Sequence, residues 1–475
     1  MNNNKHDHII EWVVFLSMLT LFLFYCFLRA YLLSFTHDEA CSYAIILGHE
    51  VFPNTPNNHM FNTILMAISR RMINDSEWAL RLPHVLGGAL YFYGGYKIIK
   101  GKGPGMLFLG LSMLLAHHFV IEFFSLARGY GIALGFMLMS LYFTLRNNSK
   151  PASMHQWSIN FALAICFATC AIYANLAFIN FYISILVYFV VQYIQRRIET
   201  KYLPENDSLF LKMTYVSLVP LALGVKRLLF LRDTKQLNFG ADSLSECFDS
   251  LISTAIYATT PDPRLILILK IFFLINLLLG LILPLVNKSC NTKLFGISSI
   301  LLMLIAGLIL ENYLFGVKFP FRRTAIYFYP LFALQTYSLL VFIFTRYRII
   351  KSVKITFILL LTILIYLNLG KAINIKKTST WRYDMNTKEA MVLIKNNIRS
   401  QKQDYTISNH WLLEPSINYY IMRWNLNMQL ANRDGINEES DFILGHHYNK
   451  APESYVLIRR FPDSKSSLWI KNDSR

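Results

Sequence analysis

The stretch that decides the fold, Ser34 to His84, reads SFTHDEACSYAIILGHEVFPNTPNNHMFNTILMAISRRMINDSEWALRLPH. It directly follows an apolar run, residues 12–33, that is long enough to cross a lipid bilayer. Yet it opens with Thr36-His37-Asp38-Glu39 and closes with Arg81-Leu82-Pro83. Charged side chains beside hydrocarbon are costly and usually serve a function, so this loop is the first candidate for a functional site.

Two segments of the loop, residues 39–49 and 59–73, carry apolar residues at three- and four-residue spacing. This spacing predicts amphipathic helices, and such helices lie flat at a membrane interface. The loop is therefore expected to cover a site as a lid rather than to serve only as a linker.

The composition of the chain excludes an ordinary soluble domain, because 54% of the 475 residues are hydrophobic and only 16% are charged. Apolar runs of about twenty residues predict about eleven membrane spans. The predicted spans are residues 12–33, 82–99, 104–121, 127–145, 157–174, 176–194, 211–231, 264–286, 293–315, 324–344 and 354–371. We therefore expect a polytopic α-helical membrane protein.

The basic residues predict the orientation of these spans. The formal net charge is +18, and most Lys and Arg residues lie in short clusters between apolar runs. Such clusters are typical of topology signals and of contacts with anionic lipids, so membrane lipids are expected partners and nucleic acid is not. With a cytoplasmic N-terminus, the 34–84 loop and everything after Lys371 fall on the outer side. The predicted location is a bacterial inner (plasma) membrane, with the loop facing the periplasm or exterior.

The composition becomes mixed and polar after Lys371. Helical spacing at residues 387–398 and 415–424, with short strand-like runs at 404–408 and 454–458, predicts a small α/β domain on the outer face. The predicted domains are thus a transmembrane domain, residues 1–371, and a soluble domain, residues 372–475.

Three features occur here in a fixed order: an acidic pair after the first span, a polar turn with His59, and the element Glu77-x-x-x-Arg81-Leu82-Pro83. In them the sequence resembles the GT-C membrane glycosyltransferases, specifically the family 39-like branch of dolichyl-phosphate-mannose-protein mannosyltransferases and aminoarabinose transferases. The resemblance is best over residues 34–146, weaker near Arg322 to Pro330, and absent from the C-terminal domain. It implies a GT-C fold and transfer of a sugar from a polyprenyl-phosphate carrier to an acceptor on the outer side of the membrane.

The chemistry of such a transfer needs a base, because a sugar hydroxyl is too weak an acid to attack unaided. With the resemblance, this assigns Asp38 as the base and Glu39 as the residue that orients it or binds sugar hydroxyls. The open alternative is that Asp38 only caps the helix that begins beside it. The sequence offers no second carboxylate that would suggest a covalent intermediate. Direct displacement with inversion at the sugar carbon is therefore expected.

The departing phosphate needs cationic partners. The resemblance places Arg128, Arg322 and Arg323 at the phosphate, where charge-assisted hydrogen bonds strengthen as the bond to the sugar breaks. Tyr130 joins the substrate-binding set because Arg128-x-Tyr130 resembles the family pattern. Arg81 is expected either to bind the phosphate or to pair with Glu77, one helical turn earlier.

Asn58 and His59 are predicted to hold the loop and the sugar phosphate. His37 and His59, with a carboxylate, also form a reasonable ligand set for a divalent metal, which some relatives bind and others do not need. Because these ligands have no regular spacing, the metal site is the weaker hypothesis.

The predicted activity is therefore a mannosyltransferase-like, inverting hexosyl- or pentosyltransferase that uses a polyprenyl-phosphate sugar and a glycan, lipid or protein acceptor. The alternatives are a transporter or flippase for a lipid-linked saccharide, and a receptor or scaffold whose C-terminal domain is the active part. Transporters tend to place charge near the bilayer midplane and to contain internal repeats. Here the charge concentrates in one loop and no repeat is visible, which favours the transferase.

Overall fold

The computed structural model describes residues 2–49, 55, 58–115, 117–146, 154–200, 207–237, 239–257, 261–287, 292–347, 349–398, 404–447 and 452–472. The chain forms two compact units. The membrane unit consists of Met1–Tyr25, His84–Phe124 and Gly129–Ile373. The α/β unit consists of Cys26–Pro83, Ser125–Arg128 and Asn374–Arg475.

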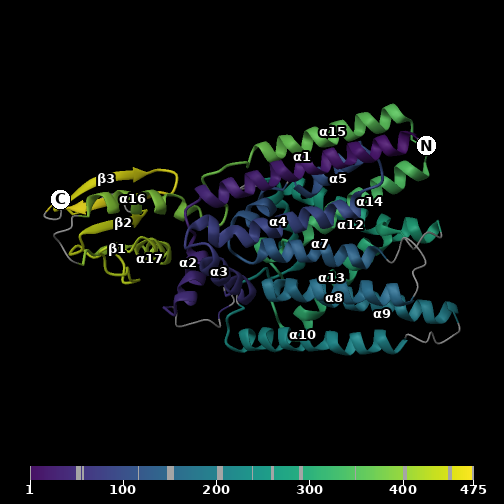
Figure 1. Cartoon of the computed structure of the whole chain (residues 1–475), viewed down its shortest axis with the longest axis horizontal. Helices are drawn as coiled ribbons and strands as arrows, with labels where there is room; N and C mark the ends of the chain where they lie inside the picture. Colours follow the sequence, from purple (N-terminus) through teal and green to yellow (C-terminus); the bar gives the residue numbers. More distant parts are fainter. Residues whose placement is uncertain are drawn as a thin grey trace. The chain divides into compact units, whose positions relative to one another are not determined.

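The elements follow one another along the chain as labelled in Figure 1. They are α1 (Asn2–Leu32), α2 (His37–Leu47), α3 (Met60–Met72), α4 (Glu77–Ile99), α5 (Pro104–Leu115), α6 (His118–Glu122), η1 (Phe123–Ser125), α7 (Tyr130–Arg146), α8 (Met154–Ala174), η2 (Leu176–Phe178), α9 (Ile179–Thr200), α10 (Asp207–Asp233), α11 (Leu244–Ala255), α12 (Pro263–Val286), α13 (Lys293–Phe315), η3 (Arg322–Ala325), α14 (Phe328–Arg346), α15 (Lys351–Gly370), η4 (Arg382–Asn386), α16 (Thr387–Asn397), β1 (Ile407–Asn409), α17 (Glu414–Trp424), β2 (Phe442–His446), β3 (Tyr455–Phe461) and β4 (Ser466–Lys471).

Eight helices of the described residues are long and apolar enough to cross a membrane, or up to nine if the bent pair α5 and α6 counts as one span. This confirms a multi-pass membrane protein but not the predicted count of about eleven. The predicted span 104–121 is broken, because α5 ends at Leu115 and the next helix is bent by 70° from it. The predicted span 127–145 corresponds to α7, which has only 17 residues.

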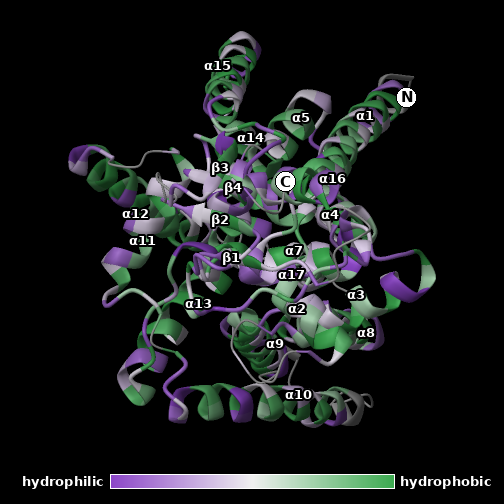
Figure 2. Ribbon diagram, turned by 90° about the vertical axis from the view of Figure 1, so that its left-hand side faces the viewer, coloured by the Kyte–Doolittle hydropathy of each residue, from purple (hydrophilic) through white to green (hydrophobic). Residues whose placement is uncertain are grey.

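The membrane unit presents apolar side chains outward. Large exposed hydrophobic residues follow one another along α12 and α15, such as Leu267, Ile271 and Leu278 on α12 and Leu360 and Leu364 on α15. Figure 2 shows α1 and α15 mostly in the colour of hydrophobic residues. An exposed apolar surface of this extent is typical of contact with lipid rather than with water.

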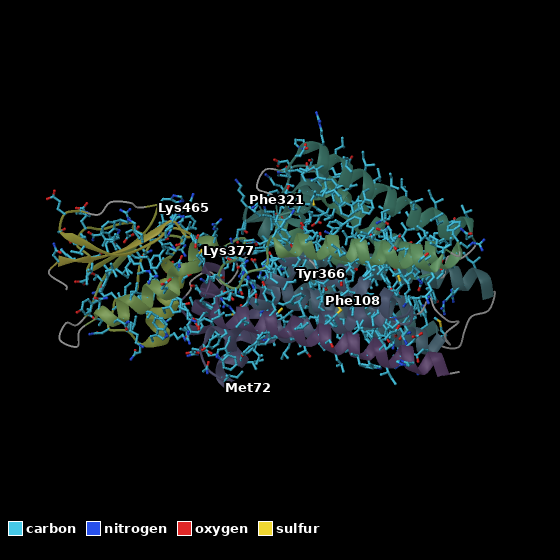
Figure 3. All side chains as sticks on the ribbon, turned by 90° about the horizontal axis from the view of Figure 1, so that it is seen from above. Met72, Phe108, Phe321, Tyr366, Lys377 and Lys465 are labelled. Carbon is cyan, nitrogen blue, oxygen red and sulfur yellow. The ribbon has the colours of Figure 1, made fainter. Side chains whose placement is uncertain are left out.

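Helices of the membrane unit pack through aromatic and small residues. Phe108 of α5 and Tyr366 of α15 stack with ring centroids 6.3 Å apart, and both are labelled in Figure 3. Between α4 and α7 the contact is closer, since a Cβ built on Gly135 would lie 2.5 Å from the carbonyl oxygen of Gly87. Glycine at this position lets the two backbones approach each other, as is common between helices in membranes.

The α/β unit contains a four-stranded sheet in the order β1-β2-β4-β3. In the sequence, α16 precedes β1, and α17 lies between β1 and β2. β1 pairs with β2 in parallel, whereas β4 is antiparallel to both β2 and β3. The predicted helices 39–49, 59–73, 387–398 and 415–424 are confirmed as α2, α3, α16 and α17. The predicted strands are confirmed as β1 and β3 with shifted bounds, but β2 and β4 were not predicted. These two central strands are buried along nearly their whole length, so they lack the alternation of apolar and polar residues that identifies a strand.

One hydrophobic core joins the 34–84 loop to the C-terminal segment. Tyr43 of α2 and Met66 of α3 belong to the same buried cluster as Ile417 of α17. The ring of Phe35 stacks on Tyr419 at a centroid distance of 4.0 Å, and the backbone N–H of Phe35 donates to the hydroxyl of Tyr420 at 2.9 Å. The loop is therefore part of a folded unit, with a core of its own.

The contact between α4 and α7 gives a first test. We expect Gly135→Ala to lower the free energy of unfolding by about 1–3 kcal/mol, because the new methyl group has no space and the backbones must separate. The matched control is Gly105→Ala in α5, where a Cβ would meet nothing within 4 Å. The measurement is the temperature at which half of the purified protein in detergent ceases to be monodisperse. Equal shifts for the two variants would contradict the close packing.

Candidate functional site

The guanidinium of Arg81, in the first turns of α4, lies at the centre of the α/β unit. Its Nε and Nη2 donate to the two carboxylate oxygens of Glu39 at 2.8 and 2.7 Å. The remaining N–H groups donate to the carbonyl oxygens of Ala30, Leu33 and Ser34 at 2.8–3.0 Å. Both side chains of the ion pair are fully buried. Arg81 thus ties the end of α1 and the start of α2 to α4.

Glu39 is fully occupied by protein donors. Besides Arg81, it accepts hydrogen bonds from the backbone N–H and the hydroxyl of Thr36 and from the backbone N–H of Ala127. Burial alone would raise the pKa of Glu39, but the charge of Arg81 and these hydrogen bonds outweigh it and hold the pKa below its ordinary value. The carboxylate stays ionised inside the protein, in a position fixed by its partners.

These contacts correct two expectations. Glu39 has no oxygen left for sugar hydroxyls, since every lone-pair direction that a ligand would need is used by protein donors. Arg81 pairs with Glu39 and not with Glu77, which forms ion pairs with Lys388 at 3.0 Å and with Arg423. Of the two roles that the sequence left open for Arg81, the pair with Glu77 is not formed, because the tertiary fold supplies a partner from another helix.

Asp38 and Arg128 form a second buried pair. Nη2 of Arg128 lies 3.0 Å from Oδ2 of Asp38, and Nη1 donates to the backbone carbonyl of Asp38 at 3.1 Å. Only 5% of Asp38 and 1% of Arg128 are exposed. Gly129 follows with a φ of 74°, a left-handed conformation that favours glycine and that lets the chain turn from Arg128 into α7.

The capping alternative for Asp38 does not fit the helix as observed. The N-cap residue is Thr36, and α2 begins at His37, so Asp38 is the second residue of the helix. Its carboxylate meets the guanidinium of Arg128 instead of serving as the cap. A carboxylate in the first turn still interacts favourably with the helix dipole.

Of the other predicted loop residues, His59 contacts this pair, whereas Asn58 and His37 bond to other parts of the α/β unit. Nε2 of His59 lies 3.5 Å from Nη2 of Arg128. Asn58 accepts a hydrogen bond from the hydroxyl of Thr63 at 2.8 Å, which fixes the start of α3. Nδ1–H of His37 donates to the carbonyl of Leu412 at 2.8 Å. Within the described part of the chain, no three His, Cys, Asp or Glu side chains converge to hold a metal ion.

Tyr130, Arg322 and Arg323 belong to the membrane unit. Tyr130 is the first residue of α7, is buried, and packs against Phe123 with ring centroids 4.7 Å apart. Arg322 is exposed and has a φ of 48°, which is unusual for a residue with a side chain. Its backbone N–H donates to the hydroxyl of Ser250 at 3.0 Å, so η3 is held in place by α11.

Two residues near the Asp38–Arg128 pair were not predicted from the sequence. The ring of Trp381 lies 5.8 Å from the guanidinium carbon of Arg128, and Asp384 accepts the backbone N–H of His37 at 2.7 Å. Asp384 and His37 are 347 positions apart in the chain. No local pattern could have joined them.

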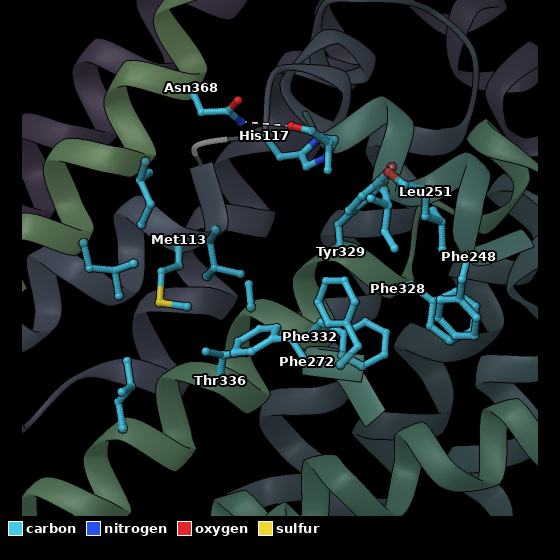
Figure 4. Close-up of a pocket in the computed structure, with 18 of the residues that line it drawn as sticks. Met113, His117, Phe248, Leu251, Phe272, Phe328, Tyr329, Phe332, Thr336 and Asn368 are labelled. Atoms are coloured by element: carbon cyan, nitrogen blue, oxygen red, sulfur yellow. Dashed lines mark hydrogen bonds between the residues drawn. The ribbon is translucent and has the colours of Figure 1, made fainter. Parts of the chain in front are cut away.

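The membrane unit contains an apolar cavity of about 440 Å³ between α5, α11, α12, α14 and α15, shown in Figure 4. Phe248, Phe272, Phe328 and Phe332 form part of its wall. At one end the ring of His117 stacks on Tyr329 with centroids 3.8 Å apart. Among the described residues, neither ring nitrogen of His117 has a hydrogen-bond partner. The cavity is thus apolar along its length, with unused polar atoms at His117.

The buried ion pair generates a prediction about stability. Arg81→Met should lower the free energy of unfolding by about 3–5 kcal/mol, because it leaves the Glu39 charge buried without its cation. The double variant Glu39→Gln/Arg81→Met should lose less than the sum of the two single variants, as a double-mutant cycle in detergent would measure. Arg433→Met is the control, since Arg433 is 54% exposed in its pair with Glu414 and such pairs contribute at most about 1 kcal/mol. Strict additivity would contradict the coupling.

No family model matches the sequence, and no curated protein matches it. Solved structures do resemble it. ArnT, the aminoarabinose transferase, from Cupriavidus metallidurans in the apo state has a TM-score of 0.53 at 10% identity, covering 96% of this chain and 97% of ArnT. ArnT bound to undecaprenyl phosphate has a TM-score of 0.47 at 13% identity, with the same coverage. The Archaeoglobus fulgidus oligosaccharyltransferase with Zn and sulfate has a TM-score of 0.42 at 12% identity, covering 90% of this chain and 68% of that one. The likeness to apo ArnT shows that the chain has the fold of the GT-C membrane glycosyltransferases.

Proposed function

We propose that the protein is an inverting glycosyltransferase that moves a sugar from a polyprenyl-phosphate-linked donor to an acceptor hydroxyl. The observation that carries this proposal is the buried pair of Asp38 and Arg128, with 3.0 Å between carboxylate and guanidinium. It lies in the loop that directly follows the first membrane helix of a multi-pass protein with the GT-C fold. One group can accept a proton and the other can hold a phosphate.

Asp38 acts as the base. It takes the proton of the acceptor hydroxyl as the hydroxyl oxygen bonds to the anomeric carbon of the sugar. The bond from that carbon to the phosphate oxygen breaks, its electron pair leaves with the phosphate, and the configuration at the carbon inverts. Phosphate is a good leaving group and needs no proton from the enzyme, so a single carboxylate is enough.

Arg128 holds the departing phosphate. Its guanidinium has five N–H donors in a planar fork, so it can keep its contact with Asp38 while it binds a phosphate oxygen. The new charge on the phosphate strengthens this contact as the reaction proceeds. His59, which lies 3.5 Å from Arg128, and Asn58 are assigned to the sugar phosphate. Arg322, Arg323 and Tyr130, which belong to the membrane unit, keep their assignment to substrate binding from the family resemblance alone. Glu39 and Arg81 fix the position of α2 and touch no substrate.

The cavity of the membrane unit is assigned to part of the isoprenoid chain of the donor. Its wall is apolar and largely aromatic, and isoprenoid chains have no hydrogen-bonding groups. The ring nitrogens of His117 are available to a polar group at one end of the bound molecule. Undecaprenyl phosphate, which binds to ArnT, is the natural probe for this assignment.

The structure offers no cluster for a resident metal within the residues that it describes, and the mechanism proposed here uses none. The proposed donor side of the reaction is the periplasmic or exterior face of the membrane, as the distribution of basic residues predicts. Glycan, lipid and protein acceptors each offer the hydroxyl that the mechanism requires.

Removing the charge of Asp38 tests the mechanism. The protein is reconstituted in proteoliposomes with undecaprenyl phosphate carrying mannose, glucose or 4-amino-4-deoxyarabinose and with a bacterial envelope extract as acceptor. Release of free undecaprenyl phosphate is followed by mass spectrometry. We expect Asp38→Asn to lower the rate by about 10²–10⁴-fold, because the amide cannot accept the hydroxyl proton.

The control for this variant is Asp233→Asn, at a carboxylate whose side chain is 63% exposed and contacts only its neighbour Arg232 among the ion pairs found. It should transfer at the wild-type rate. A flippase would move the donor across the bilayer without releasing undecaprenyl phosphate. Wild-type rates for folded Asp38→Asn protein would end the proposal.

Filling the cavity tests the assignment of the isoprenoid chain. Ala333 lines the cavity from α14, so Ala333→Phe should weaken the binding of undecaprenyl phosphate and raise the KM for the donor about tenfold, with little change in kcat. Ala171→Phe in α8 changes the same residue type at a buried position that does not line the cavity, and it controls for overpacking. Equal effects of the two variants on KM would refute the assignment.

A further inference from the structure

A short segment at the start of the C-terminal part contacts Arg128 and the residue directly before Asp38. The ring of Trp381 lies 5.8 Å from the guanidinium carbon of Arg128. Three residues later, Oδ2 of Asp384 accepts the backbone N–H of His37 at 2.7 Å. This segment therefore contacts the guanidinium of the pair directly and the backbone next to its carboxylate.

Asp384 connects the starts of two helices. Its other oxygen, Oδ1, lies 2.8 Å from the hydroxyl of Ser416 in the first turn of α17. Asp384 is 1% exposed and Ser416 is fully buried. The first amide groups of a helix have no partner within the helix, so a buried helix start needs an acceptor from elsewhere. For α2 that acceptor is Asp384.

We propose that Asp384 is a positioning residue for sugar transfer: it holds the first amide of α2 and thereby fixes where the carboxylate of Asp38 meets the acceptor hydroxyl. This inference rests on the proposed function. It makes the C-terminal segment part of the transfer machinery, although none of its side chains needs to touch the substrate. A displacement of a reacting group by about 1 Å is enough to cost about 10²-fold in rate.

Asp384 lies among other buried charged groups. Burial raises the pKa of this carboxyl well above its ordinary value; the hydrogen bonds from His37 and Ser416 oppose the shift, and the negative charges of Asp38 and Glu39 add to it. Arg81 and Arg128 face those two carboxylates and are engaged with them. Asp384 accepts the backbone N–H of His37 with Oδ2 and the hydroxyl of Ser416 with Oδ1.

The side chain of asparagine has nearly the same shape as this carboxyl but carries no charge at any pH. Its oxygen can accept the backbone N–H of His37, and its NH2 group can donate to the oxygen of Ser416 when that hydroxyl turns, so Asp384→Asn keeps the connection between the two helix starts. Alanine reproduces neither. The two substitutions therefore separate the positioning role from any need for a charge at this place.

The experiment compares Asp384→Ala and Asp384→Asn in the whole 475-residue chain, reconstituted in proteoliposomes. Hydrogen exchange followed by mass spectrometry reports on the amides at residues 36–40, and release of undecaprenyl phosphate reports on transfer. We expect Asp384→Ala to exchange faster at these amides and to lose about 100-fold in kcat with little change in the KM for the donor. We expect Asp384→Asn to match the wild type in both measurements.

Asp441 provides a matched control. It is also a buried carboxylate of the α/β unit, and it accepts the backbone N–H and the hydroxyl of Thr406 at 2.9 and 3.1 Å. These are the same two kinds of contact, but they join β1 to the start of β2 rather than holding α2. Asp441→Ala should lower the thermal stability of the protein and leave both kcat and exchange at residues 36–40 unchanged.

Three results would overturn the inference: wild-type exchange at residues 36–40 in Asp384→Ala, a wild-type kcat for this variant, or an Asp384→Asn variant as impaired as Asp384→Ala. A wild-type protein that releases undecaprenyl phosphate from none of the three donors would instead refute the proposed function. In that case the exchange measurement still decides whether Asp384 holds the start of α2.

Discussion

The ion pair between Glu39 and Arg81 is the interaction on which the rest of the site depends. Two opposite charges taken fully out of water are stable only when their hydrogen-bonding capacity is met, and here carbonyl oxygens and backbone amides complete the set. These contacts are therefore all made in only one arrangement of the end of α1, α2 and the start of α4. Asp38 adjoins Glu39 on the first turn of α2, so the ion pair also fixes the position of Asp38. This is how a flexible-looking polar loop between two apolar helices can carry a group that must be placed accurately.

The α/β unit is built from three parts of the chain that are far apart in sequence. The 34–84 loop supplies Asp38 and His59, the four residues Ser125–Arg128 supply the guanidinium, and the C-terminal segment supplies Trp381 and Asp384. A common hydrophobic core, including Phe35, Tyr43 and Tyr419, holds them together. The three parts therefore meet at or next to the Asp38–Arg128 pair.

The membrane unit has a different task. Its helices expose apolar side chains outward and enclose a largely apolar cavity, which His117, Thr336 and Asn368 line with polar atoms. A lipid-linked substrate has the same division, with a long hydrocarbon part and one charged head group. The cavity of the membrane unit is matched in chemistry to the hydrocarbon part of such a molecule, and the Asp38–Arg128 pair of the α/β unit is matched to its head group.

The sequence by itself determined the membrane class and the existence of helices in the 34–84 loop and after residue 386, because apolar run length and helical spacing are local properties. The choice of Asp38 and Arg128 also drew on the family resemblance and stays a prediction. Of about eleven predicted spans, eight helices of the described residues are confirmed as long and apolar enough, or up to nine, since α7 is short and the α5–α6 region bends. The sequence left two roles open for Arg81 and pointed neither to its partner Glu39 nor to Asp384. Only the tertiary structure decided these points, because a buried charge takes its partner from whatever the fold brings near it. For Asp384 that partner is an amide 347 positions away, and no spacing in the sequence encodes such a contact.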